Sequence, residues 1–212
     1  MVADSTRGRV WLYRGLIALG VACLITYGLF TLRTAQYQRK AKADLEEMIT
    51  VQRPPENFEQ PPDSKPLETG ELIGRVDIPR LKLSAAVAEG DDDKTLGKAV
   101  GHLPDTPLPW ERRGNVGLAA HRDGLFRRLE QIRLEDEVRV VTPRGEYHYR
   151  VKKTRIVDPD DVWVLAPTDR PTVTLITCYP FSFVGNAPQR FIVQAELVGQ
   201  VAGSVLRGSV VQ

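Results

Sequence analysis

The segment PTVTLITCYP, residues 171–180, is the part of the sequence that points most directly to the fold. It is a run of β-forming residues that ends in Cys178, and Pro180 then prevents a central strand from continuing. We therefore expect a strand over 171–178 that carries a thiol at its last position. From this segment alone, the thiol is a core residue, a disulfide partner or a nucleophile.

Six further segments alternate apolar and polar residues with the period of two that is typical of strands. They are 72–79, 84–90, 115–121, 136–142, 146–157 and 190–198. The sequence TPRGEY, residues 142–147, is expected to form a hairpin turn between two of them. Seven or eight short strands in about 130 residues predict an all-β domain, either a small closed barrel or a sandwich.

Two short helices are expected among these strands, at 92–100 and at 123–134. In the second, Asp123 is the predicted N-cap residue. The apolar residues of that helix repeat at helical spacing and are Phe126, Leu129 and Ile132.

The N-terminal region contains 18 consecutive uncharged residues, 15–32. Together with residues 11–13 this run reaches the roughly 20 residues that a helix needs to cross a bilayer. No small-x-small cleavage site follows, so we expect an uncleaved anchor rather than a signal peptide, and a buried core helix fits the long run less well. Basic residues flank both ends of the run, so the charges leave its orientation open.

Residues 33–49 are expected to continue as a short juxtamembrane helix. The segment VQRPPENFEQPPDSKP, residues 51–66, then has little apolar surface to bury and favours extended conformations. We interpret it as a spacer, although a loop packed on the domain is an alternative.

Composition and cysteine usage exclude several classes. The 212-residue chain is 42% hydrophobic, has a net charge of +2 and contains no basic block with interleaved aromatic residues, so nucleic acid is not an expected partner. It has two cysteines, and Cys23 lies inside the predicted span, where Cys178 cannot reach it. Two cysteines and three histidines are too few, at these spacings, for a structural zinc site.

Three reactive residue types stand at predicted strand ends: His121, Cys178 and Arg190. A thiolate attacks carbonyl carbon, a protonated imidazole supplies the leaving amine with a proton, and a guanidinium binds an oxyanion or a substrate carbonyl. Neighbouring strand ends of a barrel converge on one rim, so the three can share a shallow site. Spacing alone leaves open a core thiol, a surface histidine and a solvated arginine.

These residues resemble a known family. TLITC (174–178) is similar to the TLxTC motif of sortases, the membrane-anchored cysteine transpeptidases of bacteria. NVGLAAHRDGLFRRL (115–129) resembles the segment with their catalytic histidine, and APQRFIVQAEL (187–197) resembles the strand with their arginine. The longer stretches 101–126 and 177–193 are most similar to class D sortases. The resemblance covers about residues 71–200.

The resemblance implies a closed eight-stranded sortase-type β-barrel with one or two short helices. It implies that Cys178 is the nucleophile, His121 the general acid and Arg190 the group that stabilises substrate or oxyanion. The expected substrate-binding residues are Thr177, Trp163 and Tyr179, with Trp163 either a wall of the peptide groove or a core residue.

The resemblance also implies a reaction. An LPxTG- or LPxTA-like sorting signal is cleaved after Thr through a thioacyl intermediate on Cys178, and the acyl group passes to an amine of a peptidoglycan precursor or of another protein. Water in place of the amine gives hydrolysis. Expected partners are surface proteins with a C-terminal sorting signal and the membrane lipid, and we expect a monomer.

The expected organisation follows from both lines of reasoning. It comprises a cytoplasmic N-terminus (1–10), a transmembrane signal-anchor (11–32), a juxtamembrane segment and Pro-rich linker (33–70), a catalytic β-barrel (71–200) on the extracytoplasmic side and a flexible C-terminal tail (201–212). The sequence has neither a second apolar span nor a clear lid motif, which favours protein anchoring at the cell envelope over pilus assembly.

No cofactor is expected. The run 91–93 of three aspartates suggests Ca²⁺, as in some class A sortases, but a solvated helix start is the favoured interpretation. His102 is expected to be structural, and His148 to lie on a solvated strand face.

Two alternatives to the transpeptidase stay open. One is a membrane-tethered peptide-binding module without turnover, although binding does not require a thiol. The other is a thiol peptidase that mainly hydrolyses its substrate. A cell-wall cysteine L,D-transpeptidase fits less well, because no His-Gly pair precedes Cys178 closely.

Overall fold

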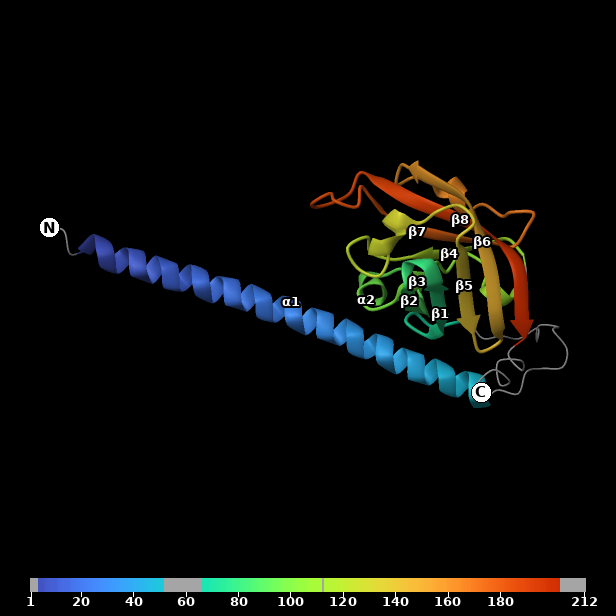
Figure 1. Cartoon of the computed structure of the whole chain (residues 1–212), viewed down its shortest axis with the longest axis horizontal. Helices are drawn as coiled ribbons and strands as arrows, with labels where there is room; N and C mark the ends of the chain where they lie inside the picture. Colours follow the sequence, from blue (N-terminus) through green and yellow to red (C-terminus); the bar gives the residue numbers. More distant parts are fainter. Residues whose placement is uncertain (1–3, 52–65, 112, 203–212) are drawn as a thin grey trace. The chain divides into compact units, whose positions relative to one another are not determined.

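The computed structural model describes residues 4–51, 66–111 and 113–202 (Figure 1). It divides into two compact units, residues 1–37 and 38–212. A single helix, α1 (Asp4–Val51), runs through the first unit and into the second.

The part of α1 in the first unit has the character of a membrane span. Within the described ranges, one helix is long and apolar enough to cross a membrane, judged by length and composition. Its large apolar side chains are exposed along residues 11–32. The hydroxyl of Thr26 donates to the carbonyl oxygen of Cys23 at 2.9 Å, and that of Thr31 donates to Gly28 at 3.0 Å. These polar groups are therefore satisfied within the helix, as a lipid environment requires.

The second unit is a closed barrel of eight strands, in the order β1-β2-β3-β4-β7-β8-β6-β5. The strands are β1 (Leu72–Ile78), β2 (Leu83–Glu89), β3 (Val100–His102), β4 (Asn115–Ala119), β5 (Glu137–Thr142), β6 (Gly145–Val157), β7 (Thr172–Tyr179) and β8 (Gln189–Ala202). This confirms the predicted closed eight-stranded barrel.

The strand directions matter for the site. β4 and β7 are parallel neighbours, whereas β7 and β8 are antiparallel. The last residues of β4 and β7 and the first residues of β8 therefore lie at the same rim of the barrel.

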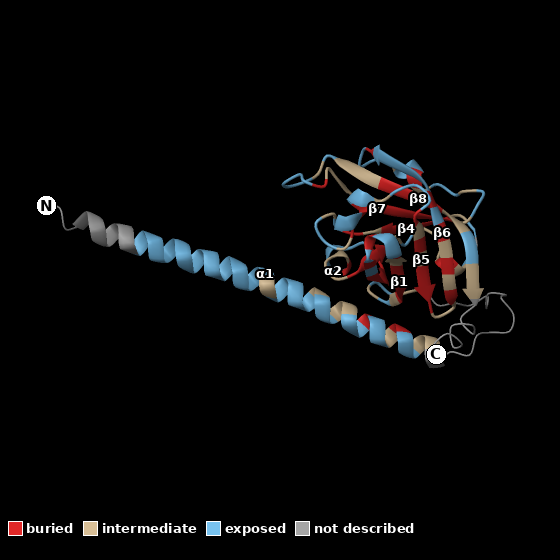
Figure 2. Ribbon diagram, in the orientation of Figure 1, coloured by how far each residue is buried: buried red, intermediate tan, exposed pale blue. Residues whose placement is uncertain are grey.

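Alternation of side chains fills the barrel. Every second residue of a strand points inward, and these residues form one large core that appears as buried segments in Figure 2. Among its members with 0% exposure are Val76, Ile78, Val87, Leu118, Val140, Val151, Val173, Leu175 and Val193.

Most predicted strands begin within one or two residues of the expected position, and β8 extends to Ala202. The TPRGEY hairpin is present, since Thr142 pairs with Gly145 and its hydroxyl accepts a hydrogen bond from the amide of Arg144 at 3.1 Å. The first predicted helix is shorter than expected: α2 is Asp93–Leu96, and β3 occupies the end of the predicted range.

The second predicted helix, 123–134, is wrong. The chain forms turns and then a 3-10 helix, η3 (Arg127–Gln131), and the residue at its N-cap is Phe126 rather than Asp123. Phe126, Leu129 and Ile132 are spaced by three residues, which is the period of a 3-10 helix. Leu129 lies in η3, Phe126 and Ile132 are its cap residues, and all three pack on the core.

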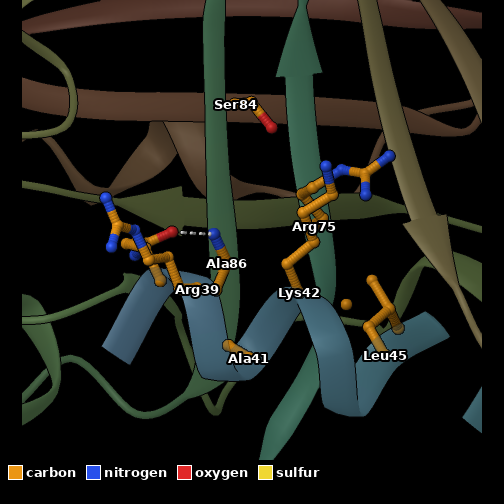
Figure 3. Close-up of a pocket in the computed structure, with 9 residues that line it drawn as sticks. Arg39, Ala41, Lys42, Leu45, Arg75, Ser84 and Ala86 are labelled. Carbon is orange, nitrogen blue, oxygen red and sulfur yellow. Dashed lines mark hydrogen bonds between the residues drawn. The ribbon is translucent and has the colours of Figure 1, made fainter. Parts of the chain in front are cut away.

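Residues 38–49 of α1 pack on the strands of the second unit. Ala41 and Leu45 are 3% and 1% exposed. The Gln38 side chain accepts a hydrogen bond from the amide of Ala86 at 2.8 Å and donates to the carbonyl oxygen of Lys98 at 2.7 Å. Figure 3 shows Ala41 and Leu45 of this segment beside β1 and β2. Both residues line a cavity of about 200 Å³. The compact unit thus begins before the predicted boundary at residue 71, and the Pro-rich part of the linker falls largely outside the described residues.

Candidate active site

Cys178 lies near the end of β7, directly opposite Arg190 of β8. The two form a cross-strand pair in the antiparallel register, and Arg190 is also paired with Val157 at the end of β6. Side chains of directly opposite residues in an antiparallel pair have neighbouring Cβ atoms on one face of the sheet. Cys178 and Arg190 are therefore neighbouring residues on one face of the sheet at the rim.

His121 follows β4 at the same rim. Ala119 is paired with Ile176, and the amide of Ala120 donates to the carbonyl oxygen of Ile176 at 3.2 Å. The paired residues end at Ala119 and Ile176, and a continuation of this register by two residues would bring His121 level with Cys178. The carbonyl oxygen of His121 then accepts from the amides of Gly124 and Phe126, both at 3.2 Å, and this turn ends the strand.

Cys178 points to the outer face of the barrel. Leu175 belongs to the inner core, whereas Ile176 packs in a second cluster on the outside. Alternation puts Cys178 on the same face as Ile176. Cys178 is a free thiol and is half-buried, Arg190 is half-buried, and His121 is exposed. The three predicted catalytic residues therefore lie at the surface of the barrel rather than in its interior.

The second hydrophobic cluster packs on the outer face of the strands, next to Cys178 and Arg190. It contains Val157, Val164 and Ile192, with Leu165 and Ile176 packed against them. Val164 and Leu165 belong to η4 (Val162–Leu165), a 3-10 helix in the connection from β6 to β7. This connection covers the outer face of the strands next to Cys178.

Asn115 fixes that connection. It is 1% exposed, its amide nitrogen donates to the carbonyl oxygens of Val164 at 2.8 Å and Ala166 at 3.3 Å, and its oxygen accepts from the Thr174 hydroxyl at 2.6 Å. The Gln194 side chain donates to the Val164 carbonyl as well, at 3.1 Å. One buried amide thus joins β4, β7 and η4.

The predicted substrate-binding residues have different placements. Thr177 is 2% exposed and its hydroxyl donates to the carbonyl oxygen of Ala120 at 2.8 Å. Tyr179 packs against the core and stacks on Phe191, with ring centroids 6.4 Å apart. Trp163 is 50% exposed, and its indole nitrogen donates to Asp161 at 2.9 Å. Of the three, Trp163 has the most open side chain, and the three substrate contacts stay predictions.

The other two histidines lie outside this site. His102 is buried, and its Nδ1 is 2.8 Å from a carboxylate oxygen of Glu89. His148 contacts Glu137 at 2.9 Å, and this hydrogen bond holds the pKa of the Glu137 carboxyl below its usual value. Both histidines join strands of the barrel.

The aspartate run also has a structural part. The Asp92 carboxylate accepts from the amides of Lys94 and Thr95 and from the Thr95 hydroxyl, so it caps α2. The hydroxyl of Thr95 is the main cause of a lowered Asp92 pKa, with the two amides adding to it.

Sequence reasoning did not single out Arg122, Arg127 or Asn115. Arg122 donates through Nη2 to the carbonyl oxygens of Phe183 at 2.7 Å and Gly185 at 2.8 Å, and Arg127 donates to that of Phe181. The position of Arg122 directly after His121 was the one feature of the sequence that could have indicated a role for it. Its acceptors are about 60 residues away along the chain, so only the fold reveals them.

The fold and the rim define a class: closed β-barrels that carry a thiol, an imidazole and a guanidinium at the ends of neighbouring strands. The sortase domain family model matches residues 76–198. The chain therefore belongs to the sortase family, whose members are cysteine transpeptidases.

Individual relatives agree with this assignment. Sortase D of Bacillus subtilis (strain 168) is 39% identical over 132 residues, which cover 62% of this chain and 66% of that protein. Sortase SrtE1 of Streptomyces coelicolor is 26% identical over 201 residues, which cover 85% of this chain and 54% of that protein. The chain thus spans between about half and two thirds of the length of these relatives.

Solved structures share the fold. The SrtA sortase from Actinomyces oris has a TM-score of 0.61 at 29% identity, covering 71% of this chain and 93% of that one. Sortase E1 from Streptomyces coelicolor, solved with a tripeptide in the active site, has a TM-score of 0.59 at 28% identity, covering 66% of this chain and 94% of that one. A Clostridium perfringens sortase D5 transpeptidase has a TM-score of 0.66 at 24% identity, covering 77% and 99%.

Proposed function

We propose that the protein is a membrane-anchored cysteine transpeptidase that cleaves an LPxTG- or LPxTA-like sorting signal after Thr and transfers the acyl group to an amine. The observation that carries the proposal is the placement of Cys178 opposite Arg190, with His121 brought to the same rim by the β4–β7 register. The tripeptide in the active site of the related Streptomyces coelicolor structure supports a peptide substrate.

In the acylation step the Cys178 thiolate attacks the carbonyl carbon of the Thr residue, and the C–N bond to Gly or Ala breaks. His121, as imidazolium, gives its proton to the leaving amine. Arg190 hydrogen-bonds the carbonyl oxygen as negative charge develops on it. The product is a thioester on Cys178 and a free amine on the released peptide.

In the second step an amine attacks the thioester carbonyl. A new C–N bond forms, the C–S bond breaks, and the proton lost by the amine passes through the neutral His121 imidazole. Cys178 then returns to its starting state. Water in place of the amine gives a free carboxylate, so the ratio of amide to acid product measures how far the enzyme transfers rather than hydrolyses.

The location follows from the same proposal. Residues 11–32 of α1 span the membrane once, residues 1–10 are cytoplasmic, and the barrel works on the extracytoplasmic side, where sorting signals are presented. The clients are surface proteins with a C-terminal sorting signal, and the amine comes from a peptidoglycan precursor or another protein. The exposed apolar surface of α1 supports the membrane assignment.

The test uses the full chain in detergent micelles with fluorogenic LPxTG and LPxTA peptides, with and without triglycine, and mass spectrometry of the products. We expect an amide-linked triglycine product from the wild type. Cys178→Ala should lower turnover by at least about a thousandfold, and His121→Ala by about a hundred- to ten-thousandfold.

The chain supplies a matched control in its other thiol. Cys23→Ser changes a residue of α1 and should keep full turnover, because only Cys178 lies at the barrel rim. Cleavage without transfer to any amine would make the protein a hydrolase. Saturable peptide binding with no turnover, unchanged by Cys178→Ala, would make it a binding module.

A further inference from the structure

The loop from β7 to β8, residues 180–188, connects the two strands that carry Cys178 and Arg190. We call it the β7–β8 loop. Phe181 is its one buried residue, and Ser182 to Asn186 are all exposed. A loop with so little buried apolar surface owes its conformation to polar contacts.

Those contacts come from two arginines that follow His121. Arg122 donates through one nitrogen, Nη2, to the carbonyl oxygens of Phe183 at 2.7 Å and Gly185 at 2.8 Å. Its guanidinium carbon also lies 5.9 Å from the centroid of the Phe183 ring. Arg127 donates to the carbonyl oxygen of Phe181. Three backbone carbonyls of one loop are thus held by charged donors from the segment that begins at His121.

The side chain of Arg122 is held in an unusual state. Its other terminal nitrogen, Nη1, is buried and has no hydrogen-bond partner among the described residues. Unpaired buried donors are rare in folded proteins, and each one calls for an explanation. The two loop carbonyls are held by Nη2, while Nη1 has no partner among the described residues.

The same loop leads directly into Arg190. The Arg190 guanidinium donates through Nη1 to the carbonyl oxygens of Ala187 at 3.3 Å and Gln189 at 3.1 Å. A shift of the loop backbone therefore moves the acceptors that orient Arg190. The path runs from Arg122 to Gly185, along the chain to Ala187 and then to the Arg190 side chain.

We propose that Arg122 is a positioning residue that, with Arg127, clamps the β7–β8 loop to the His121 segment and thereby orients Arg190 toward the peptide. The clamp joins the strand end that supplies the acid to the loop between the nucleophile and the arginine. The kinetic part of this proposal rests on the proposed transpeptidase function, whereas its structural part does not.

The experiment compares Arg122→Gln, Arg122→Lys and Arg127→Gln in the full chain in detergent micelles. Arg128→Gln is the matched control, because Arg128 is also in η3 but donates to the carbonyl oxygens of Leu81 and Lys82, away from the loop. Each variant is measured for kcat and KM separately and for amide hydrogen exchange of the peptide that covers 180–188.

For Arg122→Gln we expect kcat/KM to fall about ten- to a hundredfold, mainly through kcat, as for a small misplacement of a reacting group. Arg127→Gln should lower it about three- to tenfold, the factor for one hydrogen bond. Arg122→Lys should lie between the wild type and Arg122→Gln, because an ammonium keeps the charge but not the planar fork. Exchange at 181–187 should rise in the Arg122 and Arg127 variants and stay unchanged in Arg128→Gln.

Hydrogen exchange separates positioning from a direct electrostatic effect of Arg122. If Arg122 acts through the loop, the loss of kcat/KM and the rise in exchange at 181–187 occur together in Arg122→Gln and, to a smaller extent, in Arg127→Gln. Unchanged exchange in the loop or a kcat/KM equal to that of Arg128→Gln would overturn the positioning role. Should the wild type turn over no peptide, the proposed function fails, while exchange still decides whether the clamp exists.

Discussion

The hydroxyl of Thr177 donates a hydrogen bond to the carbonyl oxygen of Ala120 at 2.8 Å. The residue before the proposed nucleophile is thereby joined to the residue before the proposed general acid. This bond is buried, and it lies beside the β4–β7 ladder that ends with Ala119 and Ile176. The rim is thus fixed at the positions next to the two reacting groups, which leaves those groups free to meet a substrate.

Thr177→Val tests this link. The substitution keeps a β-branched shape but leaves the Ala120 carbonyl oxygen without its donor, and a buried unpaired acceptor costs about 1–3 kcal/mol. We expect the free energy of unfolding to fall by that amount. We also expect kcat/KM to fall about tenfold or more, because the backbone just before His121 is no longer held to β7. Urea unfolding and peptide turnover measure the two effects. Thr177→Ser keeps the donor and should retain most of both, so equal losses in the two variants would contradict the link.

Asn115→Ala removes three hydrogen bonds at once. Asn115 is the amide that joins β4 and β7 to η4, and its loss leaves the Thr174 hydroxyl and the carbonyls of Val164 and Ala166 short of a partner. We expect destabilisation of about 2–4 kcal/mol, measured by urea unfolding, since more than one buried polar group is affected. Gln194→Ala is the control: it removes one donor to the Val164 carbonyl and should cost about 1 kcal/mol. If Asn115→Ala lowers the free energy of unfolding no more than Gln194→Ala does, the bridging role of Asn115 between β4, β7 and η4 is refuted.

Asp136 gives stability a defined dependence on pH. Its carboxylate accepts from the Arg80 guanidinium, which is the main cause of a lowered Asp136 pKa, and the amide of Arg133 adds to the effect. The folded-state pKa is below the unfolded value of about 3.9. This contribution is therefore present above about pH 4 and is lost as pH falls through the folded-state pKa.

Asp136→Asn should accordingly lower the free energy of unfolding by about 1–3 kcal/mol at pH 7. The gap to the wild type should close in acid, below the folded-state pKa. Urea unfolding at pH values from 7 to about 2.5 measures this gap. Asp160→Asn, which changes an exposed aspartate in the β6–β7 connection, should match the wild type across the range. A gap that stays constant as pH falls would contradict the pairing.

Leu45→Ala tests whether the end of α1 belongs to the barrel unit. Leu45 is 1% exposed, and the neighbouring Gln38 accepts from the Ala86 amide at 2.8 Å. Truncation of a buried leucine removes the apolar contacts that hold its segment in place. We expect faster hydrogen exchange of the Ala86 amide in Leu45→Ala and in Gln38→Ala, but not in Lys42→Ala, whose side chain is 61% exposed. Unchanged exchange at Ala86 in the first two variants would show that this helix segment does not dock.

Strand periodicity made most of the barrel predictable. β7 was expected at 171–178 and is found at Thr172–Tyr179, whereas β8 was expected at 190–198 and extends to Ala202. β3 was missed because three residues, Val100–His102, are too few to show a period. The predicted α-helix at 123–134 was wrong because a spacing of three residues also fits a 3-10 helix. In place of a cap by Asp123, the carbonyl oxygen of His121 accepts hydrogen bonds from the amides of Gly124 and Phe126.

The candidate catalytic residues were identifiable from motifs, whereas their supports were not. Cys178 and His121 stand at strand ends that a sequence reveals. Arg122 and Asn115 act through backbone carbonyls far away in the chain. Every residue has a backbone carbonyl, so the sequence does not indicate which one is the partner. Which carbonyl an arginine or asparagine reaches is decided by barrel closure, so these two roles required the structure.

The central claim is that Cys178 carries the acyl group. The most direct measurement is to mix the full chain in detergent micelles with an LPxTG peptide, quench in acid, digest, and determine the mass of the fragment that contains Cys178. We predict an added mass equal to the peptide through Thr, present in Cys23→Ser, removed by hydroxylamine and absent in Cys178→Ala. Product formation with no adduct on Cys178, or turnover that persists in Cys178→Ala, would contradict the account.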